Sequence, residues 1–219
     1  EEGVYSIIMT GASEAERASY ERALEGAIGA VENMDFWTIS PAVSRELAER
    51  SVTAILLVLF GISLYVTYAF RAVSWPVSSL KYGVVTLVTL AHDVAIPAGL
   101  FALLGYLRGV TVDTNFIVAL LTVMGFSVHD TIVVFDRIRE NLMKKTGESL
   151  AIVVNRSVNE TLHRSINTSL TLVLVLAALY LFGPISTQYF VLAILVGTLV
   201  GTYSSIFVAS PLLVLWQEF

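Results

Sequence analysis

A few ionisable residues lie within long apolar stretches, and they are the side chains best placed to do chemistry. Asp93 and Asp130 interrupt two such stretches, each directly after a histidine, His92 and His129, and Arg164 precedes a third. An ionisable side chain in a membrane interior costs about 2.5–3.5 kcal/mol on insertion scales, so it commonly faces the protein and has a function. Two carboxyl groups and one guanidinium in such positions predict the binding and release of protons.

The central hypothesis concerns Asp130 and Arg164. Asp130 lies within its apolar stretch and Arg164 just before the next one, both near the same side of the membrane. Arg164 shares a helix face with Asn167, Thr168 and Thr171. Such a polar stripe is unfavourable against lipid, so we expect it to face Asp130. Because a nearby arginine favours the charged form of a carboxyl group, movement of Arg164 could switch the proton affinity of Asp130.

Each of these residues also has a structural interpretation. Asp130 and Arg164 could form a static ion pair, and Arg164 is close enough to the interface to extend towards water. Asp93 could pair with a neighbouring helix and only fix its packing. His129 points about 100° away from Asp130 on a helix, where it is either a second titrating group or a hydrogen-bonded interior residue. The three histidines are far apart in the sequence, and we expect no metal and no cofactor.

Asp93 lies near the middle of its apolar stretch, and Pro97 follows one turn later. Proline has no backbone N–H, so the carbonyl of Asp93 should lack its helical partner and the helix should bend. Thr86, and either Thr89 or Leu90, share this face, which predicts a polar stripe directed to the interior.

The composition excludes several classes of protein. Of 219 residues, 56% are hydrophobic and 14% are charged, whereas soluble domains contain about 25% charged residues. The mean hydropathy of +0.76 excludes an ordinary soluble domain and a disordered chain. A net charge of −5 argues against a nucleic-acid-binding chain, and the absence of cysteine excludes disulfides and thiolate chemistry.

The apolar stretches predict a polytopic α-helical membrane protein, since a spanning helix needs about 20 mostly apolar residues. We place five spans at about residues 52–70, 82–107, 115–135, 166–182 and 188–215. Residues 136–164 have the amphipathic pattern of helices that lie along a membrane surface. In the last span, Gly197, Gly201 and Ser205 have the spacing of a close helix contact, for which ordinary packing within the chain is the simplest interpretation.

The basic residues predict an orientation. Eight lie in the segments 71–81 and 136–164, and three flank the spans on the other side. The positive-inside rule therefore places these two segments and the C-terminus in the cytoplasm, and the N-terminal 50 residues outside.

Residues 1–50 are predicted to be the C-terminal part of a small α+β domain, and residues 51–219 the membrane bundle. Val4–Thr10 and Val31–Ile39 have the pattern of strands, and Ser13 with Glu16 forms a capping box at the start of a helix. Pro41 opens a further helix that could continue into the first span.

Four segments resemble one family closely. They are Gly125–Asn141, which contains Phe-Ser-Val-His-Asp-Thr-Ile-Val-Val-Phe-Asp-Arg-Ile-Arg, then His92-Asp93, Thr161–Ser165 and Gly201–Ser210. In these segments the chain resembles the SecF family of protein-export membrane subunits. The resemblance implies half of a resistance–nodulation–division (RND) type bundle, a ferredoxin-like extracytoplasmic domain and a further span upstream of residue 1.

The resemblance also implies a role in a bacterial or archaeal plasma membrane. A SecF-type subunit pairs with SecD, fused or separate, and works beside the SecYEG channel on preproteins with energy from the proton gradient. Asp130 and Arg164 match the family's residues for proton passage, with a SecD aspartate opposite. Asp93 matches its His-Asp pair, whereas the family usually has asparagine at the position of His129. The alternatives are a small-molecule exporter of the same superfamily and a scaffold subunit without transport; none of these is an enzyme.

Overall fold

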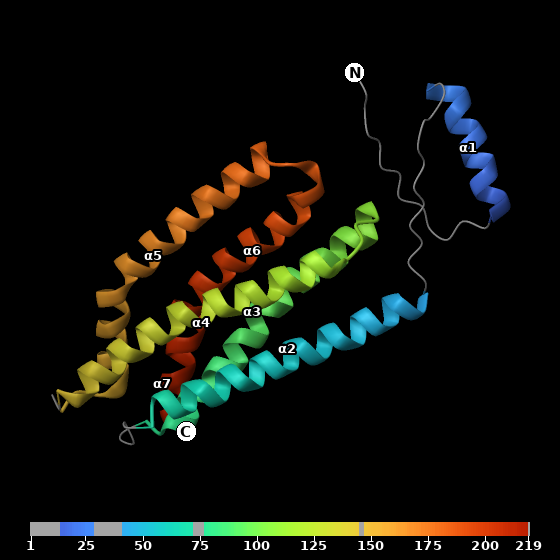
Figure 1. The fold of residues 1–219 in the computed structure, drawn as a ribbon. Helices are drawn as coiled ribbons and strands as arrows, with labels where there is room; N and C mark the ends of the chain where they lie inside the picture. Colours follow the sequence, from blue (N-terminus) through green and yellow to red (C-terminus); the bar gives the residue numbers. More distant parts are fainter. Residues whose placement is uncertain (1–13, 29–40, 72–76, 145–146, 219) are drawn as a thin grey trace. The chain divides into compact units, whose positions relative to one another are not determined.

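The computed structural model describes residues 14–28, 41–71, 77–144 and 147–218, and the chain divides into two compact units, residues 1–48 and 49–219. In the first unit, helix α1 (Glu14–Ile28) begins where the capping box predicts it (Figure 1). The two predicted strands lie outside the described residues. The described part of this unit is helical, so the α+β domain stays a prediction.

The second unit contains the five predicted membrane spans. Each is a helix long and apolar enough to cross a bilayer. The first four are α2 (Pro41–Ala69), of which residues 49–69 belong to this unit, α3 (Ser79–Arg108), α4 (Thr114–Met143) and α5 (Leu150–Phe182). The fifth is a run of four consecutive segments: the 3-10 turn η1 (Ile185–Thr187), α6 (Gln188–Ser204), the π-helical segment η2 (Ser205–Ala209) and α7 (Ser210–Glu218).

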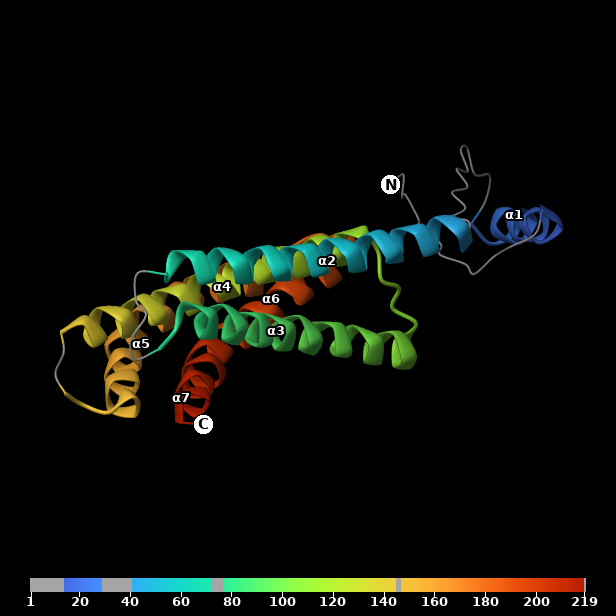
Figure 2. The same ribbon diagram turned by 90° about the horizontal axis from the view of Figure 1, so that it is seen from below.

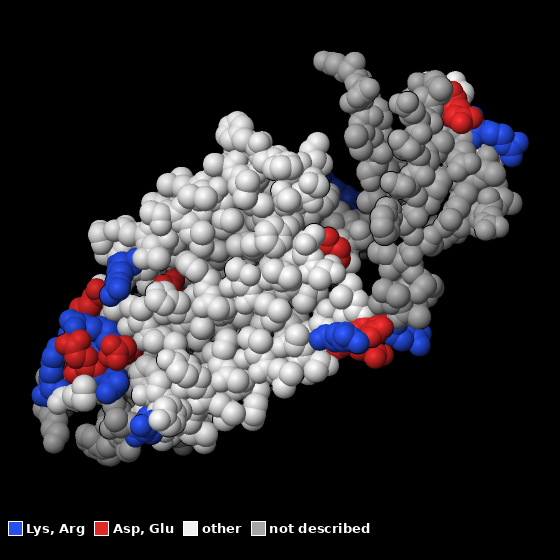
Figure 3. All heavy atoms as spheres, in the orientation of Figure 1, with Lys and Arg blue, Asp and Glu red and all other residues white. Residues whose placement is uncertain are grey.

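The helices are longer than the predicted spans. A helix of 30 residues, such as α3 or α4, is about 45 Å long, whereas the hydrocarbon core of a bilayer is about 30 Å thick. The helix α3 also continues through Pro97 to Arg108. Figure 3 shows charged side chains gathered where α4 and α5 meet, and a central surface nearly free of charge.

Individual residues determine where α3 ends and where α4 begins. Gly109 follows α3 with φ of 69°, a left-handed conformation that glycine adopts without steric strain. Asp113 then caps α4, because its side chain accepts a hydrogen bond of 3.0 Å from the backbone N–H of Phe116. A tight connection of five residues therefore joins α3 to α4.

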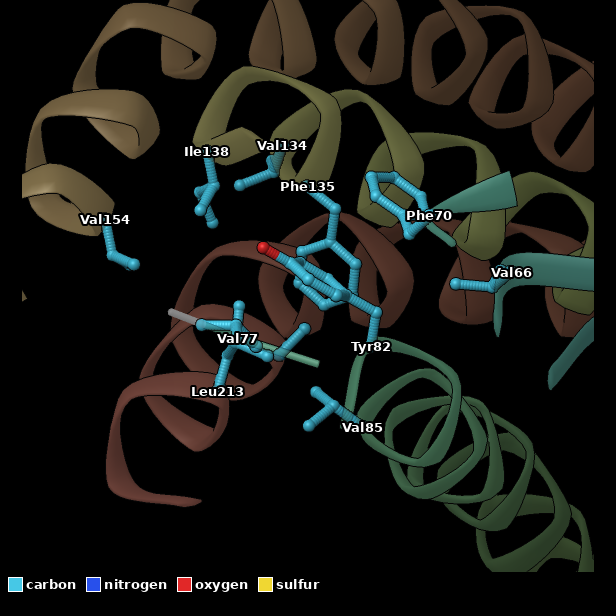
Figure 4. Packing of buried hydrophobic residues seen from close by; sticks show 11 residues of the cluster. Val66, Phe70, Val77, Tyr82, Val85, Val134, Phe135, Ile138, Val154 and Leu213 are labelled. Carbon is cyan, nitrogen blue, oxygen red and sulfur yellow. The ribbon is translucent and has the colours of Figure 1, made fainter. Parts of the chain in front are cut away.

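The centre of the bundle is formed by α4 and the fifth span, which are more buried than α2 and α5. Figures 1 and 2 both show α6 beside α4. One core cluster joins α2, α3, α4, α5, η2 and α7 around Tyr82 (Figure 4). The ring of Tyr82 stacks on Phe70 at a centroid distance of 4.9 Å and meets the edge of Phe135 at 5.1 Å.

The amphipathic segment 136–164 is helical for most of its length, as the ends of α4 and α5. Most positions of its apolar stripe pack inside the protein, whereas Met143 and Ile152 are exposed. Ile138 of α4 and Val154 of α5 are buried in the same cluster, with Leu142, Leu150 and Val158 against it. Burial of this stripe leaves less apolar area for binding to a membrane surface, and that interpretation of the segment stays a prediction.

Candidate functional site

The carboxylate of Asp93 joins three helices. Its side chain has no exposed surface. Ser127 of α4 and Ser204 of α6 both donate hydrogen bonds to Oδ2, the second at 2.7 Å, and Nδ1 of His92 lies 2.9 Å from Oδ1. Burial of a carboxylate is unfavourable unless its oxygens are hydrogen-bonded, and here both oxygens have partners.

Asp130 forms a second polar centre in the same bundle and is 3% exposed. Ser169 of α5 donates a hydrogen bond of 3.4 Å to Oδ2 of Asp130. The hydroxyl of Thr202 on α6 lies 2.6 Å from the hydroxyl of Ser169. The carboxyl group thus meets a hydroxyl group, which can donate to its charged form and accept from its protonated form.

The two centres share the helices α4 and α6. Ser127 lies three residues before Asp130, almost one helical turn, and Ser204 lies two residues after Thr202. A displacement of α4 against α6 would therefore change the contacts of Asp93 and Asp130 together.

Gly197 and Gly201 lie where α6 meets α4. A Cβ atom added at Gly197 would lie 2.3 Å from Cγ2 of Val123, and one added at Gly201 would lie 2.8 Å from Cβ of Ser127. These glycines bring the helices close enough for Ser127 to reach between them. Ser205 is also buried and begins the π-helical segment, with its hydroxyl 3.0 Å from the carbonyl of Thr202.

The predicted polar stripe of α5 does not face Asp130. Arg164, Asn167, Thr168 and Thr171 are all exposed, and the amide of Asn167 contacts the ring of His163. No ion pair between Arg164 and Asp130 is present in the part of the chain that the structure describes. The expected packing is therefore wrong for this chain alone: Ser169, about 100° around α5 from Thr168, makes the contact instead.

His129 is exposed on α4, about 100° around the helix from Asp130. His92 is half-buried beside Asp93, and His163 is exposed. Across residues 14–28, 41–71, 77–144 and 147–218, no three histidine, aspartate or glutamate side chains are grouped to hold a metal ion.

Arg164 instead lines a pocket of about 300 Å³ between α4 and α5. Arg137 in this pocket pairs with Glu140 and, at 2.5 Å, with Glu160. Asn141 donates a 2.8 Å hydrogen bond to the same oxygen of Glu160. The pocket is lined by Val133, Asp136, Arg137, Glu140, Glu160, Thr161 and Arg164.

The sequence interpretation missed Ser169 and Thr202, and it treated Ser204 only as a small residue. Serine and threonine in a helix commonly bond to their own backbone, so their presence gave no reason to select them. The one available signal was the four-residue spacing of Ser165 and Ser169 at the start of a long stretch without charged residues.

A bundle of five long apolar helices, with two carboxyl groups buried where the helices meet, defines a polytopic membrane protein. Residues 19–219 match the family described as protein export membrane protein SecD/SecF, C-terminal. The chain therefore belongs to the SecD/SecF family.

Relatives and a solved structure agree with this assignment. The chain is 50% identical to the protein translocase subunit SecF of Thermobaculum terrenum over 203 residues, 93% of this chain and 63% of that protein. It is 44% identical to the protein translocase subunit SecDF of Thermus thermophilus over 181 residues, 83% of this chain and 23% of that protein. A crystal structure of SecDF in a super-membrane-facing form matches with a TM-score of 0.76 and 38% identity, covering 94% of this chain and 26% of that one. The chain thus spans slightly less than two thirds of the SecF relative.

Proposed function

We propose that this chain is the membrane portion of a SecF-type subunit that works with SecD and uses the proton gradient to promote preprotein export through the SecYEG channel. Relatives named as protein translocase subunits, among them a fused SecDF, support this proposal. The spans and the buried carboxyl groups give the chain the parts that proton coupling in a membrane needs.

The observation that carries the proposal is the environment of Asp130. It is 3% exposed in a membrane-spanning helix, and its hydrogen bond comes from the uncharged hydroxyl of Ser169. A static ion pair with Arg164 would hold Asp130 in its charged form, whereas a hydroxyl partner suits both protonation states. Asp130 is thus suited to exchange a proton during a cycle.

The second part of the proposal concerns Arg164. Its exposed side chain is free to meet a carboxylate on SecD, as the family resemblance implies, in one conformation and to approach Asp130 in another. Asn167 and Thr168 extend the same exposed face, and we assign them to this relay. Asp93 and His129 are proposed as accessory groups, since Asp93 shares α4 and α6 with the Asp130 centre through Ser127 and Ser204.

The available energy is sufficient to bias such a conformational change. One charge that crosses the membrane yields about 2.3 kcal/mol per 100 mV. That energy shifts a two-state equilibrium by about 50-fold, if it is coupled fully to the change.

Replacement of the key carboxyl group tests the proposal. Asp130→Asn in the full-length subunit, assembled with SecD in membrane vesicles, should abolish the proton-dependent part of preprotein export while the two proteins still copurify. Asp113→Asn is the matched control: it removes one negative charge from the exposed cap of the same helix, and asparagine is also a good cap. Normal proton-stimulated export by Asp130→Asn would refute the relay and favour the scaffold alternative.

We also propose a location in the plasma membrane of a bacterial or archaeal-type cell, with the N-terminal unit outside and the C-terminus in the cytoplasm. The excess of basic residues at the α4–α5 end supports it. The chain contains no cysteine, so single cysteines introduced at Ile185 and Lys144 report each side. A membrane-impermeant thiol reagent added to intact cells should label position 185 and spare position 144; the reverse pattern would overturn the orientation.

A further inference from the structure

The buried side of α5 carries a row of hydroxyl groups, on a different face from Arg164. Thr161, Ser165 and Ser169 follow each other at intervals of four residues, and each is buried, with exposures of 7%, 1% and 5%. Four residues of helix span about 6 Å, so the three hydroxyl groups are stacked along one face of the helix.

This row connects two places already described. At one end, Ser169 donates its hydrogen bond to Asp130. At the other, Thr161 lines the charged pocket together with the carboxylates of Asp136 and Glu160. A polar route of about 12 Å on the α5 side, three helix positions long, therefore leads from the membrane interior to an open pocket.

Ser165 occupies the middle of this route, and its hydroxyl group is unusual. It is buried and has no hydrogen-bond partner among the residues that the structure describes. A buried hydroxyl group without a partner costs about 1–3 kcal/mol, so it is expected to bind a polar group such as water. The helix rise of about 6 Å between successive positions of the row is about the length of two hydrogen bonds of about 2.8 Å, so one bridging group such as a water molecule would be needed at each step.

We propose that Ser165 positions the chain of hydrogen bonds along which protons pass between Asp130 and the acidic pocket, on the buried face of α5 and not on its exposed Arg164 face. This inference rests on the proposed proton coupling. The proton leaves the Asp130 carboxyl group, each water or hydroxyl group accepts one proton and gives up another, and the last proton reaches a pocket carboxylate or bulk water. No electrons are transferred, and every intermediate group ends as it began.

The test compares variants of nearly identical shape. The full-length subunit assembled with SecD is placed in lipid vesicles that contain a pH-sensitive dye, and proton flux follows an imposed pH gradient. Ser165→Val and Ser165→Thr add similar volume and differ in the hydroxyl group. We expect Ser165→Val to reduce the proton flux at least about tenfold, which corresponds to about 1.4 kcal/mol in the barrier, and Ser165→Thr to retain most of it.

A second variant tests the route in case Ser165→Val does not fold. Thr161→Val keeps the shape of the native side chain and removes the next hydroxyl group of the row, so it should also slow the flux. Thr86→Val is the matched control. Thr86 and Thr161 are both buried and both donate to the carbonyl four residues earlier in their own helix, Tyr82 and Ser157, but Thr86 lies on α3 and outside the hydroxyl row. Copurification with SecD establishes that each variant assembles.

The outcomes separate this inference from the proposed function. Equal flux through Ser165→Val and Ser165→Thr, with Thr161→Val at the wild-type rate, would overturn the route along the hydroxyl row. Absence of proton flux in the wild-type complex would overturn the proposed function itself.

Discussion

Replacement of Gly197 by alanine should disturb the contact between α6 and α4 on which both carboxyl centres depend. The added Cβ would lie 2.3 Å and 2.6 Å from the two Cγ atoms of Val123, and 3.0 Å from its Cβ. These distances are far below van der Waals contact, so the helices must separate or Val123 must move. Overpacking of this kind costs about 1–3 kcal/mol.

The matched control is Gly99→Ala on α3, where an added Cβ meets nothing within 4 Å. Both variants gain the same intrinsic preference of alanine over glycine for helix, about 1 kcal/mol. Their difference therefore isolates the steric cost, and Gly197→Ala should be less stable than Gly99→Ala by about 1–3 kcal/mol.

The assay is thermal unfolding of the purified full-length subunit in detergent, for the two single variants and for Gly197→Ala combined with Val123→Ala. The second change removes the two Cγ atoms that the new Cβ would meet, so the double variant should recover part of the loss. A double-mutant cycle should give a favourable coupling of about 0.5–3 kcal/mol. Equal stability of Gly197→Ala and Gly99→Ala, with no coupling to position 123, would refute the packing argument.

Two further predictions concern buried polar groups. Tyr82→Phe should leave the thermal stability unchanged or raise it by up to about 1–3 kcal/mol. The Tyr82 hydroxyl is buried without a partner in the described residues, and the ring that stacks on Phe70 is kept. A clear loss of stability would show that the hydroxyl has a partner. Asp93→Leu should lower the melting temperature more than Asp93→Asn. Leucine leaves the Ser127 hydroxyl without its partner, at about 1–3 kcal/mol, and leaves the Ser204 hydroxyl only the carbonyl of Gly201, whereas the asparagine oxygen can still accept from both. Similar melting temperatures for the two Asp93 variants would contradict the role of these hydrogen bonds.

The sequence was sufficient for the features that depend on local composition. Runs of about 20 apolar residues predicted all five spans, because a bilayer imposes that length on any helix that crosses it. The rarity of ionisable residues in those runs was enough to select Asp93 and Asp130, and the motif around Asp130 indicated the family. The helix ends were predicted less well, since polar residues also continue a helix beyond the membrane.

Only the tertiary structure decided which groups meet. Ser204 is 111 residues from Asp93 in the chain, and Ser169 is 39 from Asp130, so no spacing along the sequence could pair them. The arginine stripe and the hydroxyl row of α5 are both polar faces of one helix, separated by about 100°. Local sequence shows both faces equally, and the packing of α4 and α6 against one of them determines that the hydroxyl row is buried and that Arg164 is left exposed.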